Sequence, residues 1–457
     1  MVSAAITMVQ ARSVAPVVPQ VPRGRTAYAL FLLLTAILIA RPTELIPALD
    51  GAPLYEITII ATLLAALPMV LKQLSPAALI AKPITPCVFG ICAMVLLSLL
   101  SQGKPEEAFT EAISFAKISL YYLMLISLAS TPRRLRGLLI LVCVCVTFIA
   151  ILAILQYYNY INIQSLAPVL DSGLNQDGQE FRFERLRGPG IFNDPNDICH
   201  ILGLSILACC YAISTKRSII WRITGGAMIA VLSYAVILTQ SRGGLLALLC
   251  GMGMLIVGRF GWKRALIPAA LLLAGVLAFS SRQTNISTSS GTAQDRIQLW
   301  SDALVDFRQE PIFGIGVGDF QKTSGLVTHN SFLQSYAEMG FIGGTLFLGA
   351  FFMALRTVAR WRSETLEFMN PQLWQLRPYL AAIIVAYIVG MMSLSRGYVV
   401  PTYLVLGLAS AYQQCAARTG TLRGLRLTPS LVVHVIALSV LFLIAMYLFV
   451  IVSVRWQ

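Results

Sequence analysis

The chain has 457 residues, of which 57% are hydrophobic and only 12% are charged. A soluble domain carries about 25% charged residues, so this composition excludes an ordinary soluble protein and indicates a polytopic membrane protein. The formal net charge of +14 would suit nucleic acid, but the positions of the basic residues fit membrane topology instead, and we expect no nucleic-acid partner.

The first 25 residues contain no apolar core of the signal-peptide type. We therefore expect a cytoplasmic tail over 1–25 and an uncleaved anchor as the first span. Runs of about 20 apolar residues, the length that crosses a hydrocarbon core, recur along the rest of the chain. They predict one all-α transmembrane domain over 26–457 with about 12–13 helices. The predicted spans are 27–47, 53–71, 84–101, 112–130, 136–158, 196–214, 219–239, 243–259, 264–281, 332–358, 377–394, 399–415 and 430–453.

Basic residues recur in every second connection between these spans. With the N-terminus inside, every inner segment carries Lys or Arg, which is the distribution that membrane proteins show on the cytoplasmic side. These residues are Arg23 and Arg25; Lys72 and Lys82; Arg133, Arg134 and Arg136; Lys216, Arg217 and Arg222; Arg259, Lys263 and Arg264; Arg356, Arg360 and Arg362; and Arg418, Arg423 and Arg426. Two long polar segments, about 159–195 and 282–330, then lie outside, and loops of such length are usually functional or disordered.

Nine cysteines lie almost wholly in apolar runs without the spacing of zinc ligands. We interpret them as small buried hydrophobic residues and not as a disulfide framework. Two of the three histidines, His200 and His434, also fall in apolar runs, and we interpret both as packed core residues.

The first outer segment ends in Arg187-Gly188-Pro189-Gly190-Ile191-Phe192-Asn193-Asp194-Pro195-Asn196-Asp197. Asp194 and Asp197 could ligate a divalent cation, which needs several oxygen ligands. A helix start is the favoured interpretation, with Asn193 or Asp194 as N-cap and Pro195 at the first helical position. We therefore expect no metal and no other cofactor.

Two very short outer turns contain arginine, although the outer side disfavours it. These are Ser241-Arg242-Gly243 and Ser395-Arg396-Gly397. An arginine that reaches the lipid headgroups is the simplest explanation. That explanation does not account for arginines on the outer side of the membrane, whereas guanidinium groups that bind phosphate oxygens there would.

The second outer segment contains an amphipathic stretch from Asp295 to Leu304, and later Gly314-Ile315-Gly316. The glycines have no βαβ context, so a tight turn is favoured over a nucleotide loop. Then follow His329 and Asn330, before Ser331-Phe332-Leu333-Gln334, which fits a capping box with Ser331 as N-cap.

His329 would then lie beside the positive end of a helix dipole, where anions bind. An imidazole can act as a general base near pH 7; a histidine bonded to a local carbonyl is the structural alternative. Further along this helix, Glu338 is expected to pair with Gln334. Together, Arg187, Arg242 and Arg296 could converge with His329 into a cationic pocket for a diphosphate.

These features together resemble the O-antigen ligase and polymerase superfamily of bacterial envelope glycosyltransferases. The residues that carry the resemblance are the Arg187–Phe192 and Asn193–Asn196 segments, Ser241-Arg242-Gly243-Gly244, Arg296 with Trp300, Gly314-Ile315-Gly316, and His329–Leu333 with Glu338-Met339-Gly340. The motifs cover about 185–345, and the span pattern covers the whole chain.

The resemblance implies a helical, GT-C-like enzyme in the bacterial inner membrane whose active site faces the periplasm. Its donor would be O-antigen on undecaprenyl diphosphate and its acceptor a sugar hydroxyl of lipid A–core, with membrane lipids around it. Arg242, Arg296 and His329 match the catalytic positions, whereas Arg187 matches less closely; Asn330 and Arg396 are further candidate binding residues. The reaction would be metal-independent and would invert the anomeric centre.

An O-antigen polymerase and a protein O-oligosaccharyltransferase remain alternatives within the same chemistry. A transporter of lipid-linked glycan is the alternative from a different class. A transporter would hold its charges near the middle of the membrane, at broken helices, whereas the candidate residues here belong to the outer edge. The basic outer residues Arg182, Arg185, Arg187, Arg282, Arg308 and Lys322 favour the ligase, because they would attract a phosphorylated acceptor.

Overall fold

The computed structural model describes residues 24–174, 180–215, 218–261, 263, 292–360, 370–418 and 424–453. Its elements are α1 (Arg25–Ala40), α2 (Pro42–Leu45), α3 (Leu54–Gln73), α4 (Pro76–Ala81), α5 (Ile84–Ser101), α6 (Pro105–Leu128), α7 (Pro132–Tyr157), β1 (Val169–Leu174), β2 (Glu180–Arg185), α8 (Pro195–Thr215), α9 (Ile219–Thr239), α10 (Arg242–Phe260), α12 (Thr292–Gln309), α13 (Asp319–Ser324), α14 (Ser331–Arg360), α16 (Pro371–Met391), α17 (Val400–Ala417) and α18 (Pro429–Ser453). Short 3₁₀ turns lie at Pro47–Leu49, Gln164–Leu166 and Gly190–Phe192.

Ten helices in the described part of the chain are long and apolar enough to cross a membrane, which confirms a polytopic membrane protein. The predicted spans 27–47 and 399–415 coincide with α1 and α17, which are helical but fall outside these ten. The predicted span 264–281 lies outside the described residues, as do the tail over 1–23 and the basic residues Arg23, Lys216, Arg217, Arg264, Arg362 and Arg423. The first span ends earlier than predicted because Arg41 takes a left-handed backbone conformation (φ 50°) before Pro42.

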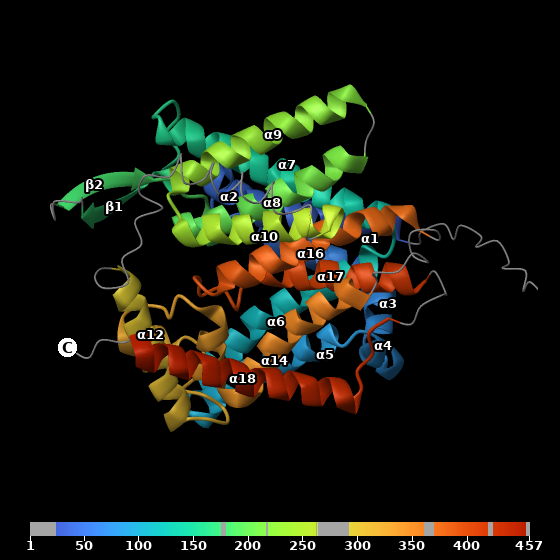
Figure 1. Ribbon diagram of the computed structural model, residues 1–457. Helices are drawn as coiled ribbons and strands as arrows, with labels where there is room; N and C mark the ends of the chain where they lie inside the picture. The colour runs from blue at the N-terminus through green and yellow to red at the C-terminus, as the bar shows by residue number, and fades with distance from the viewer. Residues whose placement is uncertain are drawn as a thin grey trace, which may run out of the picture.

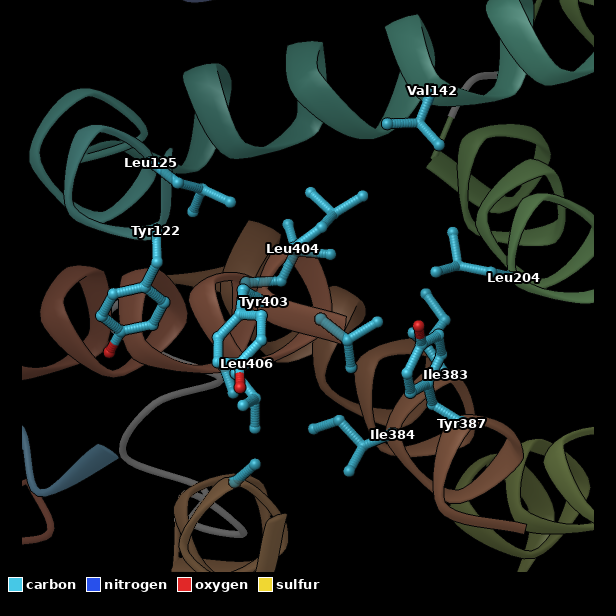
Figure 2. Packing of buried hydrophobic residues seen from close by; sticks show 14 of the residues in the cluster. Tyr122, Leu125, Val142, Leu204, Ile383, Ile384, Tyr387, Tyr403, Leu404 and Leu406 are labelled. Carbon is cyan, nitrogen blue, oxygen red and sulfur yellow. The ribbon is translucent and has the colours of Figure 1, made fainter. Parts of the chain in front are cut away.

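The helices run alongside one another across the molecule, with α16 and α17 in the middle of the bundle (Figure 1). α16 packs on α8, α10, α14 and α17, and α17 packs on α6. Figure 2 shows how Tyr403 and Leu404 of α17 lie between Leu125 of α6 and Ile383 of α16. All nine cysteines are free thiols.

Some polar groups inside this core form hydrogen bonds with one another across helices, which lowers the cost of burying them. The hydroxyl of Tyr122, one of the labelled side chains in Figure 2, lies 2.8 Å from Ser410 Oγ and 3.0 Å from Thr85 Oγ1. A single buried tyrosine therefore joins α5, α6 and α17.

Loops that the charge pattern predicts on the inner side contact one another at one end of the bundle. Arg134 Nη2 donates to the Gly24 carbonyl at 3.3 Å, and Arg418 Nη1 donates to the Ser130 carbonyl at 2.8 Å. We call this the basic end.

The segments predicted outside contact one another at the opposite end, together with β1, β2 and α12 (Figure 1). Gln102 Nε2, between α5 and α6, donates to the Gly314 carbonyl at 3.1 Å, and Lys104 Nζ forms an ion pair with Asp319 at 2.8 Å. We call this the outer end. The contacts therefore group the loops as the predicted topology requires.

The first outer segment is not irregular throughout, because β1 and β2 form an antiparallel pair with Val169 opposite Arg185. The membrane-spanning part that the structure describes is helical, as predicted, and this hairpin is a local addition to it in the first outer segment. The physical reason is visible in β2, where Phe181 and Phe183 alternate with charged residues, the period of a strand with two unlike faces.

Near the outer end, α14 is interrupted at Gly340, which has a positive φ of 65°. The 311–316 segment enters this break, with Ile315 N donating to the Ala337 carbonyl at 3.0 Å and Phe341 N donating to the Pro311 carbonyl at 2.7 Å. A Cβ at Gly340 would lie 2.2 Å from the Ile312 carbonyl oxygen. The glycines here thus allow two backbones to touch.

Candidate functional site

The turn that carries His329 is fixed by its own side chains at the start of α14. Asn330 Oδ1 accepts hydrogen bonds from Phe332 N at 3.1 Å and Leu333 N at 3.2 Å. Asn330 is therefore the N-cap, and the prediction of Ser331 in that role is wrong. The Asn330 side chain reaches the free N–H groups of the first turn, while the Ser331 hydroxyl is used elsewhere.

Ser331 instead joins the start of α14 to the turn between α16 and α17. Its hydroxyl donates to the Leu394 carbonyl at 2.5 Å and accepts from Arg396 N at 2.8 Å. Gln334 Nε2 donates to Glu338 Oε1 at 3.1 Å, which confirms their predicted pairing. This pairing also explains why Gln334 does not complete a capping box.

His329 has a left-handed backbone conformation, with a φ of 51°. A non-glycine residue in this region is strained, and such strain is common at functional sites. The turn is held from the other side by Trp300, whose Nε1 donates to the Thr328 carbonyl at 2.9 Å. Neighbours on both sides of His329 thus fix its position.

Trp300 belongs to α12, which lies against α14 and α18. The apolar face of α12 contributes Ile297 and Leu304 to a second apolar cluster, which also contains Leu333 of α14 and Met446 of α18. The amphipathic helix predicted from the sequence is therefore present, and it is anchored to the membrane domain.

One turn before Trp300, Arg296 is half-buried beside the charges of Asp194, Arg185 and Arg242. Burial lowers the pKa of Arg296, and Asp194 acts in the opposite direction. This residue thus belongs to the same group of charges as His329.

Arg242 is the first residue of α10, directly after the N-cap Ser241, whose Oγ accepts from Gly244 N at 3.1 Å. The Arg242 side chain is exposed. Close packing fixes this helix start, because a Cβ at Gly243 would lie 2.3 Å from Ser393 Oγ in the turn after α16. The two outer turns with arginine are therefore neighbours.

Arg396 lies in the second of these turns and is bound to Asp197 in α8. Its Nε donates to Asp197 Oδ1 at 2.6 Å, and its Nη2 bonds Asp197 Oδ2. Asp197 is 4% exposed and Arg396 is 36% exposed. Asp197 thus binds two of the three guanidinium nitrogens of Arg396.

The electrostatics of the outer end act together on His329. Burial lowers the pKa of the His329 imidazole; the charge of Arg296 lowers it further, Asp194 raises it, and Arg396 lowers it. Burial also opposes the charge on Arg396, but the hydrogen bonds and charge of Asp197 outweigh it and raise the pKa of Arg396. The net result is a neutral imidazole among permanent cations, which is the state that a general base needs.

The structure thus brings Arg242, Arg296, Arg396 and His329 to one region, as the sequence predicted for three of them. The fourth predicted arginine, Arg187, is instead hydrogen-bonded to the backbone: its Nε donates to the Ala167 carbonyl at 2.6 Å. Asn330 is fully buried, so it orients the turn and does not present a surface to a ligand.

Sequence reasoning missed the central position of Arg185, which it named only among the basic outer residues. Its Nε donates to the Thr239 carbonyl at 2.9 Å, Nη2 to Asn196 Oδ1 at 3.0 Å and Nη1 to Asp171 Oδ2 at 3.1 Å. It thereby joins β1, β2, the start of α8 and the end of α9. No local pattern reports such contacts, because their partners lie far apart along the chain.

Asp194, one of the two predicted N-cap residues, caps α8: its Oδ1 accepts from Asn196 N at 2.7 Å, and Pro195 is at the first helical position. Asp197 is bound to Arg396. Among the described residues, no group of three or more His, Cys, Asp or Glu side chains is arranged to hold a metal ion.

Comparison with known families bears directly on this region. Residues 227–348 match the O-antigen ligase family. The match contains Arg242, Arg296, His329 and Asn330 and leaves out Arg187 and Arg396. It confirms the superfamily that the sequence motifs resemble, although over a range that starts later than the motifs do. No curated protein matches the chain significantly.

The chain is therefore a multi-pass membrane protein whose residues 227–348 are similar to the O-antigen ligase family, a family of transferases that act on lipid-linked glycans. One correction concerns the remaining histidines. His434 is exposed on α18 and is not a core residue, whereas His200 is buried, as predicted. Lys322 forms ion pairs with Glu107 at 2.5 Å and with Asp319 at 3.1 Å.

Proposed function

We propose that the protein is an O-antigen ligase of the bacterial inner membrane. It transfers a polysaccharide from undecaprenyl diphosphate to a sugar hydroxyl of lipid A–core at the periplasmic face. The observation that carries this proposal is His329, held in a left-handed turn among the charges of Arg296 and Arg396, which favour its neutral form.

His329 takes the proton of the acceptor hydroxyl as that oxygen attacks the anomeric carbon of the donor. A new carbon–oxygen bond forms to the acceptor, and the bond between the anomeric carbon and the diphosphate oxygen breaks. The bonding electrons leave with the diphosphate, so negative charge develops there. Because the displacement occurs in one step, the anomeric centre is inverted.

Arg242 and Arg296 stabilise the leaving diphosphate. Preorganised cations at the place where charge develops lower the barrier, and they can do so without a metal. Arg242 suits this role because its side chain is exposed at a helix N-terminus, where the backbone also favours anions. Arg396 is bound to Asp197, so it orients the turn and adds a further cation without offering its whole guanidinium.

The position of these residues favours an enzyme over a transporter of lipid-linked glycan. His329 precedes α14, Arg242 begins α10, and Arg396 lies between α16 and α17. All are at helix ends, whereas a carrier binds its substrate near the middle of the membrane.

Ligase and polymerase share this donor chemistry and differ in the acceptor. Of the basic outer residues that suit a phosphorylated acceptor, Arg182 and Arg308 are exposed, Arg185 and Lys322 are paired with carboxylates, and Arg282 lies outside the described residues. A deletion strain separates the two functions. A ligase mutant accumulates polymerised glycan on its carrier and makes lipid A–core without O-antigen, whereas a single repeat unit on the core would identify a polymerase.

The chemistry itself is tested with purified protein, a polyprenyl-diphosphate-linked glycan and lipid A–core. His329→Ala should lower turnover by about 10²–10⁴-fold, the usual contribution of a general base, while the protein elutes and unfolds like the wild type. Turnover near the wild-type value in a well-folded His329→Ala protein would contradict the proposed base.

A further inference from the structure

A second polar recess lies at the basic end of the bundle, far along α14 and α18 from His329. It has a volume of about 250 Å³ and is lined by Arg356, Arg426 and His434, by the hydroxyl residues Thr428 and Ser430, and by Gly424, Leu425 and Leu431. Among the residues that the structure describes, no carboxylate lines it. Arg356, Arg426 and His434 are all exposed.

Hydrogen bonds to backbone carbonyls hold one wall of this recess in place. Leu427 N donates to the Ile80 carbonyl at 2.8 Å, and Gln413 Nε2 donates to the Leu425 carbonyl at 2.7 Å. These bonds fix the segment before α18 against α4 and α17. Two arginines that line a fixed, concave surface form a site for an anion, because guanidinium groups bind phosphate oxygens with directed hydrogen bonds.

The other wall is α14, which α18 approaches closely. A Cβ at Gly349 would lie 2.7 Å from Val435 Cγ1, so the two helices are in contact just beyond the recess. Arg356 is on the last turns of α14, with its guanidinium carbon 5.6 Å from the centre of the Phe352 ring. The cation is thus held at the end of an apolar helix.

The recess opens beside an apolar surface that lies along α18. Only 22% of the most apolar window of this helix is buried inside the protein, and Val433 and Leu441 are 64% and 63% exposed. In a membrane this face meets acyl chains. Anything bound at the recess therefore has hydrocarbon along α18 on one side and two guanidinium groups on the other.

We propose that this recess binds the headgroup of an anionic phospholipid, with its acyl chains along the exposed face of α18. The phosphate would accept hydrogen bonds from Arg356 and Arg426, and the hydroxyls of Thr428 and Ser430 would serve the rest of the headgroup. Charge complementarity selects the anionic class, since basic recesses between membrane helices bind acidic headgroups. The site is separate from the proposed donor site, which lies at the outer end.

The test uses the full-length protein in mild detergent, titrated with phosphatidylglycerol or with phosphatidylethanolamine of identical acyl chains. Native mass spectrometry counts the bound lipids, and thermal unfolding reports their effect. The wild type should bind phosphatidylglycerol in preference to phosphatidylethanolamine and unfold at a higher temperature with it. The double variant Arg356→Gln/Arg426→Gln should bind phosphatidylglycerol at least about tenfold more weakly.

A matched control removes the same charge from the same end of the bundle. In Arg222→Gln/Arg259→Gln both altered side chains are exposed and neither lines the recess, so phosphatidylglycerol binding should match the wild type. An equal loss in both double variants would mean general attraction to a basic surface and would overturn the proposal. Equal binding of the two lipids by the wild type would do the same. Because glycan transfer is not the readout, the result is independent of the proposed function.

Discussion

The ion pair between Asp197 and Arg396 offers the sharpest test of how the outer end is assembled. It joins α8 to the turn after α16, and the same turn holds Ser331 through Arg396 N at 2.8 Å. Asp197→Asn and Arg396→Gln each leave one member without its charged partner, whereas the double variant removes both charges.

The magnitude follows from burial and geometry. Breaking a fully buried pair costs about 3–5 kcal/mol, whereas an exposed pair contributes about 0–1 kcal/mol. Here the carboxylate is 4% exposed and the guanidinium 36%, so screening from the arginine side reduces the value. Because the pair makes two charge-assisted hydrogen bonds, we expect a coupling of about 2 kcal/mol.

The assay is a double-mutant cycle on the free energy of unfolding in mixed micelles, with turnover measured in parallel. The double variant should be less destabilised than the sum of the single variants by about that coupling. Asp197→Asn should also lower turnover, because the turn that positions Ser331 and His329 loosens. Additive costs, within about 0.5 kcal/mol, would refute the view that the pair holds this turn.

Three further outcomes are expected. The kcat/KM of the wild type should rise with pH through the lowered pKa of His329 and level off above it, since the base must be neutral. Arg296→Gln removes a positive charge that lowers this pKa, so the rising part of the pH profile should move to higher pH. A pH profile that does not move would contradict the electrostatic coupling of Arg296 to His329. Arg242→Lys should reduce turnover about tenfold or more although it keeps the charge, because lysine cannot donate two parallel hydrogen bonds. Arg259→Lys, at the other end of α10, is the control. Full activity of Arg242→Lys would show that a point charge is enough. Trp300→Phe should lower kcat more than it raises KM, because the lost hydrogen bond to the Thr328 carbonyl releases the turn of the base; an effect on KM alone would place Trp300 in binding.

The sequence alone determined the class of this protein and predicted its topology, because both depend on properties that are local along the chain. Apolar runs long enough to span a membrane identify the helices, and the basic residues between them predict the orientation. The N-cap at Asp194 and the pair formed by Gln334 and Glu338 were predicted for the same reason, since each depends on residues only a few positions apart.

Tertiary structure decided what the local pattern left open. Ser331 fits the sequence pattern of an N-cap, yet its hydroxyl is hydrogen-bonded to the backbone of Leu394 and Arg396, more than 60 positions away. Asn330 is therefore the N-cap. The sequence offered both Arg187 and Arg396 as candidate binding residues. A carbonyl at Ala167 and a carboxylate at Asp197 separate their roles, because a guanidinium binds whichever acceptor the fold brings to it.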